Sequence, residues 1–300
     1  MNMQTLQKAP PKKINWIIYA AAMTTVVLWA SGFPTTRYSL SELSVEALML
    51  FRFLVASSTM IVIGVIKKVR IPAKKDMPLI LVSGFVGIFL YMLLSKMGTA
   101  HVPAGVSSFI VNSAPVFILI MATFFLKEKV KPACWAGVGI SLIGLISVML
   151  VQTSELEANI GVFYLLLSAI ILGIYNIVQR VILKKYTAIE STTYSIVIGT
   201  LFMLVYIPAF LREIQHTSLS VNLVVIYSGI FPAAIAYLLW NFALSRVEKT
   251  TYVTVFAYLI PFFGSLIAFV WLGETFSPWA LVGGIVIVGG MLITNYFGRR

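Results

Sequence analysis

Hydrogen-bonding side chains occur at isolated positions inside long apolar stretches of this sequence. An amide or phenol that faces lipid without a partner costs free energy, so we expect most of them to point inward, toward other helices or a wet cavity. Together they would line a mostly apolar, uncharged pocket with amide and phenol groups. Hydrogen bonding between helices and aromatic belts at the headgroup level are the alternatives for any single residue. The set consists of Trp29, Ser31, Tyr91, Asn112, Tyr175, Asn176, Gln179, Tyr237, Trp240, Asn241 and Tyr258.

All of these except Ser31 and Gln179, together with Arg52, are our candidate substrate-binding residues. Arg52 is the one cation deep within an apolar stretch, where it must reach outward to water or find a partner. It could attract a substrate carboxylate, although structural pairing with Glu46 or with helix carbonyls is favoured. No Asp or Glu falls near the middle of an apolar stretch, which argues against a carboxylate proton relay there. Proton coupling through a carboxylate at the end of a stretch, or through His101, stays open.

Pro115 and Pro261 each lie near the middle of an apolar stretch. Proline removes a helix hydrogen bond and pushes against the carbonyl four residues earlier, so Pro115 should loosen the carbonyl of Val111, and Pro261 that of Ala257. A freed carbonyl is tolerated more easily against a partner helix or a wet cavity than in lipid. Pro115 and Pro261 are therefore candidate helix hinges that line a transport path. A packed kink without a function is an equally weighted alternative.

The composition places these residues in a membrane. Apolar residues make up 60% of the 300 residues, charged residues 11%, and the mean hydropathy is +0.97, which leaves too little polar surface for a water-soluble globule. A membrane-spanning helix needs about 20 mostly apolar residues to cross about 30 Å of hydrocarbon. Each stretch is continuously apolar, which predicts helices rather than barrel strands. Ten stretches qualify, at 16–36, 45–66, 77–96, 103–126, 133–151, 160–182, 190–211, 221–244, 250–272 and 278–297.

The basic residues predict the orientation of these spans. Ten spans with a cytoplasmic amino terminus place all but four of the 22 Lys and Arg residues on the cytoplasmic side, which agrees with the positive-inside rule. The formal net charge of +12 thus reflects membrane topology, and we expect no nucleic-acid partner. Both termini should be cytoplasmic in a multi-pass protein of the cytoplasmic membrane. The four exceptions are Arg37, Arg52, Lys96 and Arg212.

The sequence repeats itself without a gap at an offset of 146 residues. Two prolines, a glutamate and two glycines in one register are hard to obtain by chance. Because each copy holds an odd number of spans, the second copy must cross the membrane in the opposite direction. The distribution of basic residues agrees with opposite orientations of the two copies, because the basic turn at 127–132 corresponds to a turn at 273–278 without Lys or Arg. The matching pairs include Tyr91 and Tyr237, Pro115 and Pro261, Glu128 and Glu274, Pro132 and Pro278, Gly137 and Gly283, and Gly144 and Gly290.

We therefore expect an all-α polytopic membrane protein whose ten transmembrane helices form two inverted five-helix repeats. Small residues of the fifth and tenth spans, such as Gly137 and Gly290, should allow close helix contact; a homodimer interface is left open. The predicted parts are a cytoplasmic amino-terminal segment at 1–15, a first repeat at 16–151, an outer linker at 152–159, a second repeat at 160–297 and a cytoplasmic carboxyl terminus at 298–300.

Several short motifs, in this order and duplicated, resemble the EamA-type permeases of the drug/metabolite transporter superfamily. The resemblance covers about Trp16 to Tyr296. It implies secondary transport of small metabolites, commonly amino acids and related compounds moving outward. The motifs are Leu28-Trp29-Ala30-Ser31-Gly32-Phe33-Pro34, Phe51-Arg52-Phe53, Ala114-Pro115, Leu126-Lys127-Glu128, Ile260-Pro261 and Leu272-Gly273-Glu274, followed by Pro278 and a glycine-rich tenth span.

The sequence thus favours a secondary transporter that moves a small amphiphilic metabolite, most simply an amino acid or a related compound, by rocking two inverted halves around a central site. We find no phosphate loop, no metal-ligand cluster and no nucleophile with a base, so we expect no enzyme activity, no cofactor and no metal. The alternative is a membrane protein that does not transport, such as a lipid-acting enzyme or a scaffold. The substrate, the direction of transport, the coupling ion and the oligomeric state are not encoded in any motif we recognise.

Overall fold

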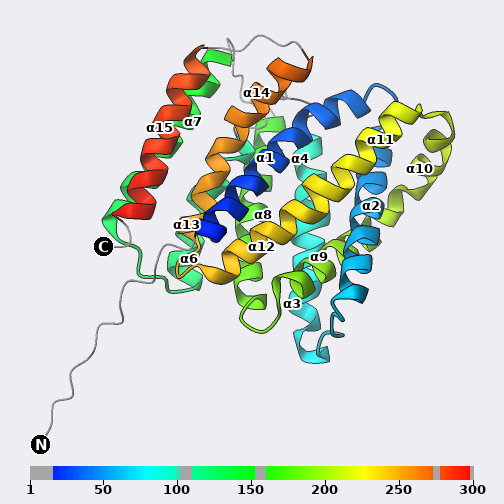
Figure 1. The fold of residues 1–300 in the computed structure, drawn as a ribbon, viewed down its shortest axis with the longest axis horizontal. Coiled ribbons are helices and arrows are strands. Elements are labelled where there is room, and N and C mark those ends of the chain that lie inside the picture. Colours follow the sequence, from blue (N-terminus) through cyan, green and yellow to red (C-terminus); the bar gives the residue numbers. More distant parts are fainter. Residues whose placement is uncertain (1–15, 100, 102–109, 153–159, 273–277, 298–300) are drawn as a thin grey trace, which may run out of the picture.

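The protein is a bundle of helices that run between two ends (Figure 1). This computed structural model describes residues 16–99, 101, 110–152, 160–272 and 278–297, and those residues contain helices and no strands. Several predicted parts lie outside the described residues: the segment at 1–15, nearly all of the linker, the start of the span at 103–126, the Glu274 turn and the carboxyl terminus at 298–300.

The helices follow the apolar stretches of the sequence. The first half contains α1 (Trp16–Ser39), α2 (Val45–Ile66), α3 (Met77–Gly84), α4 (Tyr91–Thr99), α6 (Ala114–Phe125) and α7 (Pro132–Gln152). The second half contains α8 (Ile160–Ile182), α9 (Ala188–Met203), α10 (Ile207–Glu213), α11 (Leu219–Ser228), α12 (Ala236–Arg246), α13 (Thr251–Thr254), α14 (Ile260–Leu272) and α15 (Pro278–Tyr296).

Seven of the ten predicted spans are present as helices long and apolar enough to cross a membrane. They are Trp16–Ser39, Val45–Ile66, Lys74–Thr99, Ile160–Ile182, Ala188–His216, Leu219–Arg246 and Thr251–Trp271. Shorter apolar helices occupy the other three regions, at Ala114–Phe125, Pro132–Ser147 and Val282–Phe297. The chain is therefore an all-helical, multi-pass membrane protein, and the count of ten spans stays a prediction.

Polar side chains fix where several helices begin. The Ser44 hydroxyl accepts a hydrogen bond from the Ala47 amide at the start of α2. Thr187 and Glu190 form a capping box at the start of α9, in which each side chain bonds the other residue's backbone amide. Such caps satisfy amide groups that have no partner within the helix. These capping residues therefore fix where α2 and α9 begin.

Helix irregularities occur at matching places in the two halves. The third predicted span contains a π-helical segment at Phe85–Leu90, and the eighth contains one at Gly229–Ile235, which overlaps the first after a shift of 146 residues. The helix also breaks in a turn at 112–113, just before Pro115, and narrows to a 3₁₀ segment at Val255–Leu259, just before Pro261. Both prolines thus lie in the first turn of a new α-helix, where a missing amide costs little.

Close packing joins α7 and α15, which lie side by side (Figure 1). A methyl group built on Gly137 would lie 2.6 Å from the carbonyl oxygen of Gly290, and one built on Gly290 would lie 2.5 Å from that of Gly137. A methyl group on Gly144 would lie 2.9 Å from the Gly283 oxygen. The expectation of close contact through small residues is confirmed, and it joins two helices of one chain. Gly137 thus meets Gly290, which corresponds to Gly144 at the 146-residue offset, and Gly144 meets Gly283, which corresponds to Gly137.

Candidate substrate-binding site

The two ends of the bundle are named here by their acidic residues. The Glu42 end contains the connections between α1 and α2 and between α10 and α11. The Glu128 end contains the connections between α6 and α7, between α8 and α9, and between α12 and α13.

Four of the predicted binding residues form one aromatic cluster in the middle of the bundle. The Trp29 ring of α1 lies 4.9 Å from the Trp240 ring and 5.3 Å from the Tyr237 ring, both on α12. Tyr175 of α8 meets Tyr237 edge-on at 6.0 Å between ring centroids. Trp29 is half-buried and the other three are buried. Trp29 therefore provides the accessible aromatic surface of this cluster. The three buried rings hold the Trp29 ring in place.

Asn176 and Asn241 are used inside the protein. The indole nitrogen of Trp240 donates a hydrogen bond to Asn176 Oδ1 at 2.9 Å, and Asn176 Nδ2 donates to the Leu172 carbonyl at 2.8 Å. Asn241 Nδ2 donates to the Thr192 hydroxyl at 2.9 Å, whereas its buried Oδ1 has no hydrogen-bond partner in the part of the chain that the structure describes. Asn176 thus orients Trp240. This is hydrogen bonding between helices, which the sequence left open as the alternative to substrate binding.

A second polar cluster surrounds Gln179, which the sequence predicted to point inward; its serine partners were not predicted. Gln179 Nε2 of α8 donates to the hydroxyl groups of Ser83 at 2.7 Å and Ser195 at 2.8 Å, and the Ser191 hydroxyl donates to Gln179 Oε1. Ser83 and Ser195 also share a hydrogen bond of 2.5 Å. Serines in apolar helices give little signal in a sequence, although the four-residue spacing of Ser191 and Ser195 places them on one helix face. This cluster joins α3, α8 and α9.

Arg52 projects from α2 without the partner expected for it. Among the described residues no ion pair joins Arg52 to Glu46, and the buried Arg52 Nε has no hydrogen-bond partner. The prediction of pairing with Glu46 or a helix carbonyl was wrong. Residues six positions apart lie on different faces of an α-helix, so Glu46 points elsewhere. The Arg52 guanidinium instead lies beside α1, with Nη2 3.7 Å from the position of a methyl group built on Gly32.

Among the remaining predicted site residues, Tyr258 belongs to the same buried apolar cluster as Trp240, against which Trp29 packs, whereas Tyr91 packs against the cluster that contains Ile110 and Val111. Tyr91 is half-buried at the start of α4 and Asn112 is buried in the turn before α6. Tyr258 is fully buried, and its hydroxyl has no hydrogen-bond partner among the described residues. Pro115 and Pro261 are buried just after the two helix interruptions described above. Their predicted role as hinges stays a prediction.

Four acidic residues within the described part of the chain bind groups at the ends of helices. At the Glu42 end, Glu42 accepts a hydrogen bond from the Ser218 amide at 2.6 Å, and Glu213 accepts one from the Ser44 amide at 2.7 Å. These two bonds tie the connection after α1 to the connection after α10. At the Glu128 end, Glu128 accepts bonds from the Thr250 hydroxyl at 2.7 Å and from the Thr250 amide. Glu190 pairs with Arg70 at 2.8 Å.

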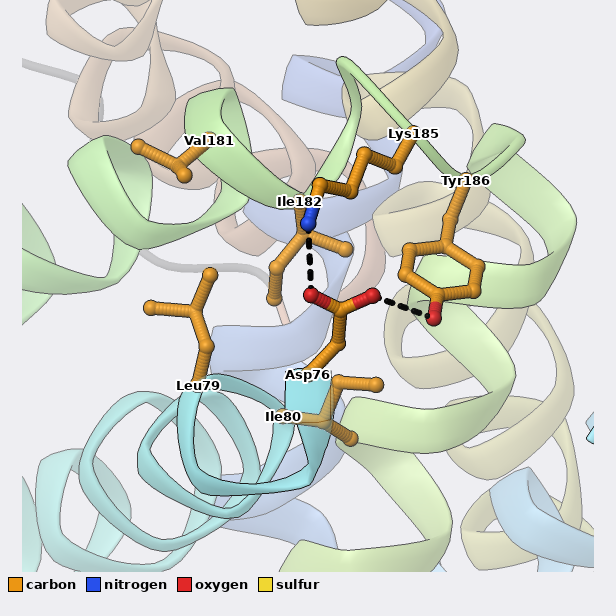
Figure 2. Close-up of a pocket in the computed structure, with 7 residues that line it drawn as sticks. All are labelled: Asp76, Leu79, Ile80, Val181, Ile182, Lys185 and Tyr186. Carbon is orange, nitrogen blue, oxygen red and sulfur yellow. Dashed lines mark hydrogen bonds and ion pairs between the residues drawn. The ribbon is translucent and has the colours of Figure 1, made fainter. Parts of the chain in front are cut away.

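A small pocket of about 30 Å³ lies at the Glu128 end between α3 and the end of α8 (Figure 2). Asp76 accepts hydrogen bonds there from Lys185 Nζ at 2.6 Å and from the Tyr186 hydroxyl at 2.9 Å. The Asp76 carboxylate raises the pKa of Lys185, so Lys185 keeps its charge throughout the physiological pH range. The pocket has room for about one water molecule. The hydrogen bonds of Asp76 connect the start of α3 to the end of α8, and the pocket is too small for a metabolite.

These observations define the class of protein: a multi-pass helical membrane protein whose middle holds aromatic, amide and cationic side chains. The family profile described as the EamA-like transporter family matches residues 16–150 and again residues 159–296. The chain therefore belongs to the EamA-like transporter family, within the drug/metabolite transporter superfamily.

Two relatives and a solved structure resemble the chain along most of its length. The "Probable terminal-alkyne amino-acid exporter" of Streptantibioticus cattleyicolor is 33% identical over 96% of this chain and 97% of that protein. The "Uncharacterized transporter YdfC" of Bacillus subtilis is 34% identical over 89% of this chain and 87% of that protein. A solved crystal structure superposes with a TM-score of 0.77 at 20% identity, covering 94% of this chain and 98% of the other, and therefore supports the fold.

Proposed function

We propose that this protein is a secondary transporter that carries a small amphiphilic metabolite, an amino acid or a related compound, out of the cell. The observation that carries the proposal is the aromatic cluster, to which α1 contributes Trp29 and the second half of the chain contributes Tyr175, Tyr237 and Trp240. A site shared between two halves can be exposed to either side when the halves move against each other. The name of the Streptantibioticus cattleyicolor relative supports an amino acid as the substrate class.

The two halves would act as inverted repeats. Three observations support this arrangement. The family profile matches twice, and the π-helical segments recur at the repeat offset. The contact of Gly137 with Gly290 and that of Gly144 with Gly283 also correspond to each other at this offset. Alternating access would follow from rocking one half against the other, with Pro115 and Pro261 as hinges near the site. Because one chain supplies both halves, this mechanism does not require a second copy.

We place the Glu42 end outside the cytoplasm and the Glu128 end inside it, with both termini in the cytoplasm. The distribution of Lys and Arg supports this orientation. An accessibility tag inserted near Glu155 should therefore be labelled by a membrane-impermeant reagent in intact cells. A tag at the carboxyl terminus is the control and should be labelled only after permeabilisation. Labelling of the terminal tag in intact cells would contradict this topology.

Counterflow in proteoliposomes tests the transport function. Vesicles that contain the purified protein and an excess of unlabelled probe should accumulate labelled probe, with L-leucine, L-phenylalanine and N-acetyl-L-phenylalanine as probes. We expect Trp29→Ala to reduce the initial rate roughly 10-fold, because it removes the accessible aromatic surface of the site. Trp135→Ala, which alters an exposed residue of α7, is the matched control. The same assay with and without a pH gradient separates proton coupling from exchange and uniport.

No accumulation of any probe above that of protein-free vesicles would contradict transport of this substrate class. Equal rates for wild type and Trp29→Ala would remove the aromatic cluster from the transport path and leave the transport function in place.

A further inference from the structure

A basic surface lies at the Glu128 end, where α2 and α8 end. The connection between α2 and α3, at 67–76, and the connection between α8 and α9, at 183–187, are joined there by hydrogen bonds. Every Lys and Arg of these two connections is exposed. We call this set the basic patch, and it consists of Lys67, Lys68, Arg70, Lys74, Lys75, Lys184 and Lys185.

Ion pairs fix the basic patch and use the acidic residues beside it. Arg70 Nε donates a hydrogen bond to Glu190 Oε1 at 2.8 Å. Asp76 accepts hydrogen bonds from Lys185 Nζ at 2.6 Å and from the Tyr186 hydroxyl at 2.9 Å (Figure 2). The other five cations form no ion pair within the part of the chain that the structure describes. The basic patch therefore keeps an excess of positive charge.

Lys68 adopts a backbone conformation that favours glycine. Its φ angle is 52°, in the left-handed region, where a residue with a side chain is strained. The Lys68 amide donates to the Val65 carbonyl at 3.1 Å, and the next amide donates to the Gly64 carbonyl at 2.8 Å. These two bonds form a Schellman motif at the end of α2, in which glycine is the usual residue at the Lys68 position. Strain that persists at an exposed lysine favours a function for its ammonium group outside the fold.

An exposed apolar face of α2 leads to the basic patch. Its members in the last two turns of the helix are Ile61, Val62, Val65 and Ile66. Val65 and Ile66 are 73% and 69% exposed, and such a face of a membrane-spanning helix contacts acyl chains. Lys67 and Lys68 follow directly, where the lipid headgroups begin. Ile71, which is 92% exposed, adds an aliphatic side chain among the cations.

We propose that this surface is a binding site for an anionic phospholipid. The acyl chains lie along the exposed face of α2, and Lys67 and Lys68 bind the phosphate by charge-assisted hydrogen bonds. Each Lys or Arg near the membrane surface strengthens the attraction of anionic lipids. A zwitterionic lipid binds less tightly, because its choline or ethanolamine cation meets the unpaired cations of the basic patch. This site is distinct from the aromatic cluster and does not depend on the transport function.

Lipid titration of the purified, delipidated protein in dodecyl maltoside tests the proposal. The probes are phosphatidylglycerol and phosphatidylcholine with the same acyl chains, and glycerol 3-phosphate and inorganic phosphate, which supply the anion without the chains. Native mass spectrometry and thermal unfolding report binding. We expect phosphatidylglycerol to bind about 10-fold more tightly than phosphatidylcholine and to raise the melting temperature. The soluble phosphates should have no effect at the same concentration.

Variants of the two lysines separate lipid binding from folding. Lys67→Gln and Lys68→Gln should each weaken the binding of phosphatidylglycerol about fivefold. Lys68→Gly should weaken binding to the same extent. Without lipid, however, Lys68→Gly should melt at or above the wild-type temperature, because glycine fits a φ angle of 52° without strain. A lysine with only a structural role would change the melting temperature and leave the lipid affinity unchanged.

Lys127→Gly is the matched control. Lys127 has a φ angle of 53° just after the end of α6, at the same end of the bundle, and Glu128 follows it in the sequence. This variant removes one exposed lysine from an equally strained position outside the basic patch. It should also melt at or above the wild-type temperature, but it should keep the wild-type affinity for phosphatidylglycerol.

Equal affinity for the two lipids, or unchanged phosphatidylglycerol affinity in Lys67→Gln and Lys68→Gly, would overturn the lipid site. Equal losses of affinity in Lys68→Gly and Lys127→Gly would overturn it too, because the whole Glu128 end would then attract anionic lipid. Stabilisation by inorganic phosphate as strong as that by phosphatidylglycerol would identify a phosphate site in place of a lipid site. Binding of a single-stranded oligonucleotide as tight as that of phosphatidylglycerol would identify a nonspecific polyanion surface instead.

Discussion

Replacing Gly290 by alanine is expected to destabilise the protein by about 3 kcal/mol or more, because the new methyl group has no room. It would lie 2.3 Å from Ser141 Oγ, 2.5 Å from the Gly137 carbonyl oxygen and 2.6 Å from the Ser141 amide nitrogen. Two of these atoms belong to the backbone of α7, so no side-chain rotation can relieve the collision. The two helices must separate along the contact, which weakens the close packing between them.

The neighbouring glycine provides the matched control. Gly289→Ala adds the same methyl group one residue earlier, where nothing lies within 4 Å. Gly139→Ala is the equivalent control for Gly137→Ala on α7. We expect both controls to melt like the wild type, or slightly higher because alanine favours the helix, while Gly290→Ala and Gly137→Ala melt well below it. Fluorescence-detected thermal unfolding in detergent measures the difference.

Equal melting temperatures for Gly290→Ala and Gly289→Ala would contradict the packing of α7 against α15. A shift from a dimer to a monomer without a change in melting temperature would instead assign these glycines to an interface between two copies. The expectation from the structure is a loss of stability within one chain.

The sequence predicts the spans well because apolar length dominates the signal. Seven predicted spans coincide with long apolar helices, and their ends differ from the predicted limits by only a few residues. The glycines of α7 and α15 were also predictable, since only small residues permit close backbone contact inside a membrane. These features depend on local composition, which a sequence displays directly.

Side-chain partners are harder to predict, because they depend on which helix faces which. Glu128 belongs to a motif visible in the sequence, but its partner Thr250 lies 122 residues away. Gln179 finds Ser83 and Ser195 on two other helices. For Arg52, the nearby Glu46 suggested a local ion pair, yet the six-residue spacing turns the two side chains to different faces of α2. Packing between helices, which no local pattern specifies, decided the partners of Glu128 and Gln179, whereas the Arg52 outcome follows from helix geometry that the sequence already contained.

Replacing Arg180 by glutamine is expected to loosen the connection between α12 and α13 at the Glu128 end. The Arg180 guanidinium donates hydrogen bonds to the carbonyl oxygens of Leu244 and Val247 and, at 2.8 Å, to that of Glu248. The last carbonyls of a helix have no partner within it, so Arg180 closes the end of α12 in the manner of a cap. Glu128 holds the other side of the same connection through Thr250.

We expect Arg180→Gln to increase local opening of residues 244–250 about 10- to 30-fold. A hydrogen bond to a charged donor contributes about 1.5–3 kcal/mol, and partial hydration of the freed carbonyls offsets part of the total loss. Hydrogen–deuterium exchange of this segment measures the change. Arg246→Gln is the matched control, because the Arg246 guanidinium lies over the Phe242 ring at 4.1 Å and the residue is exposed. Exchange that is equally fast in Arg180→Gln and Arg246→Gln would show that Arg180 does not hold this connection closed, and faster exchange confined to Arg180→Gln would identify it as the cap of α12.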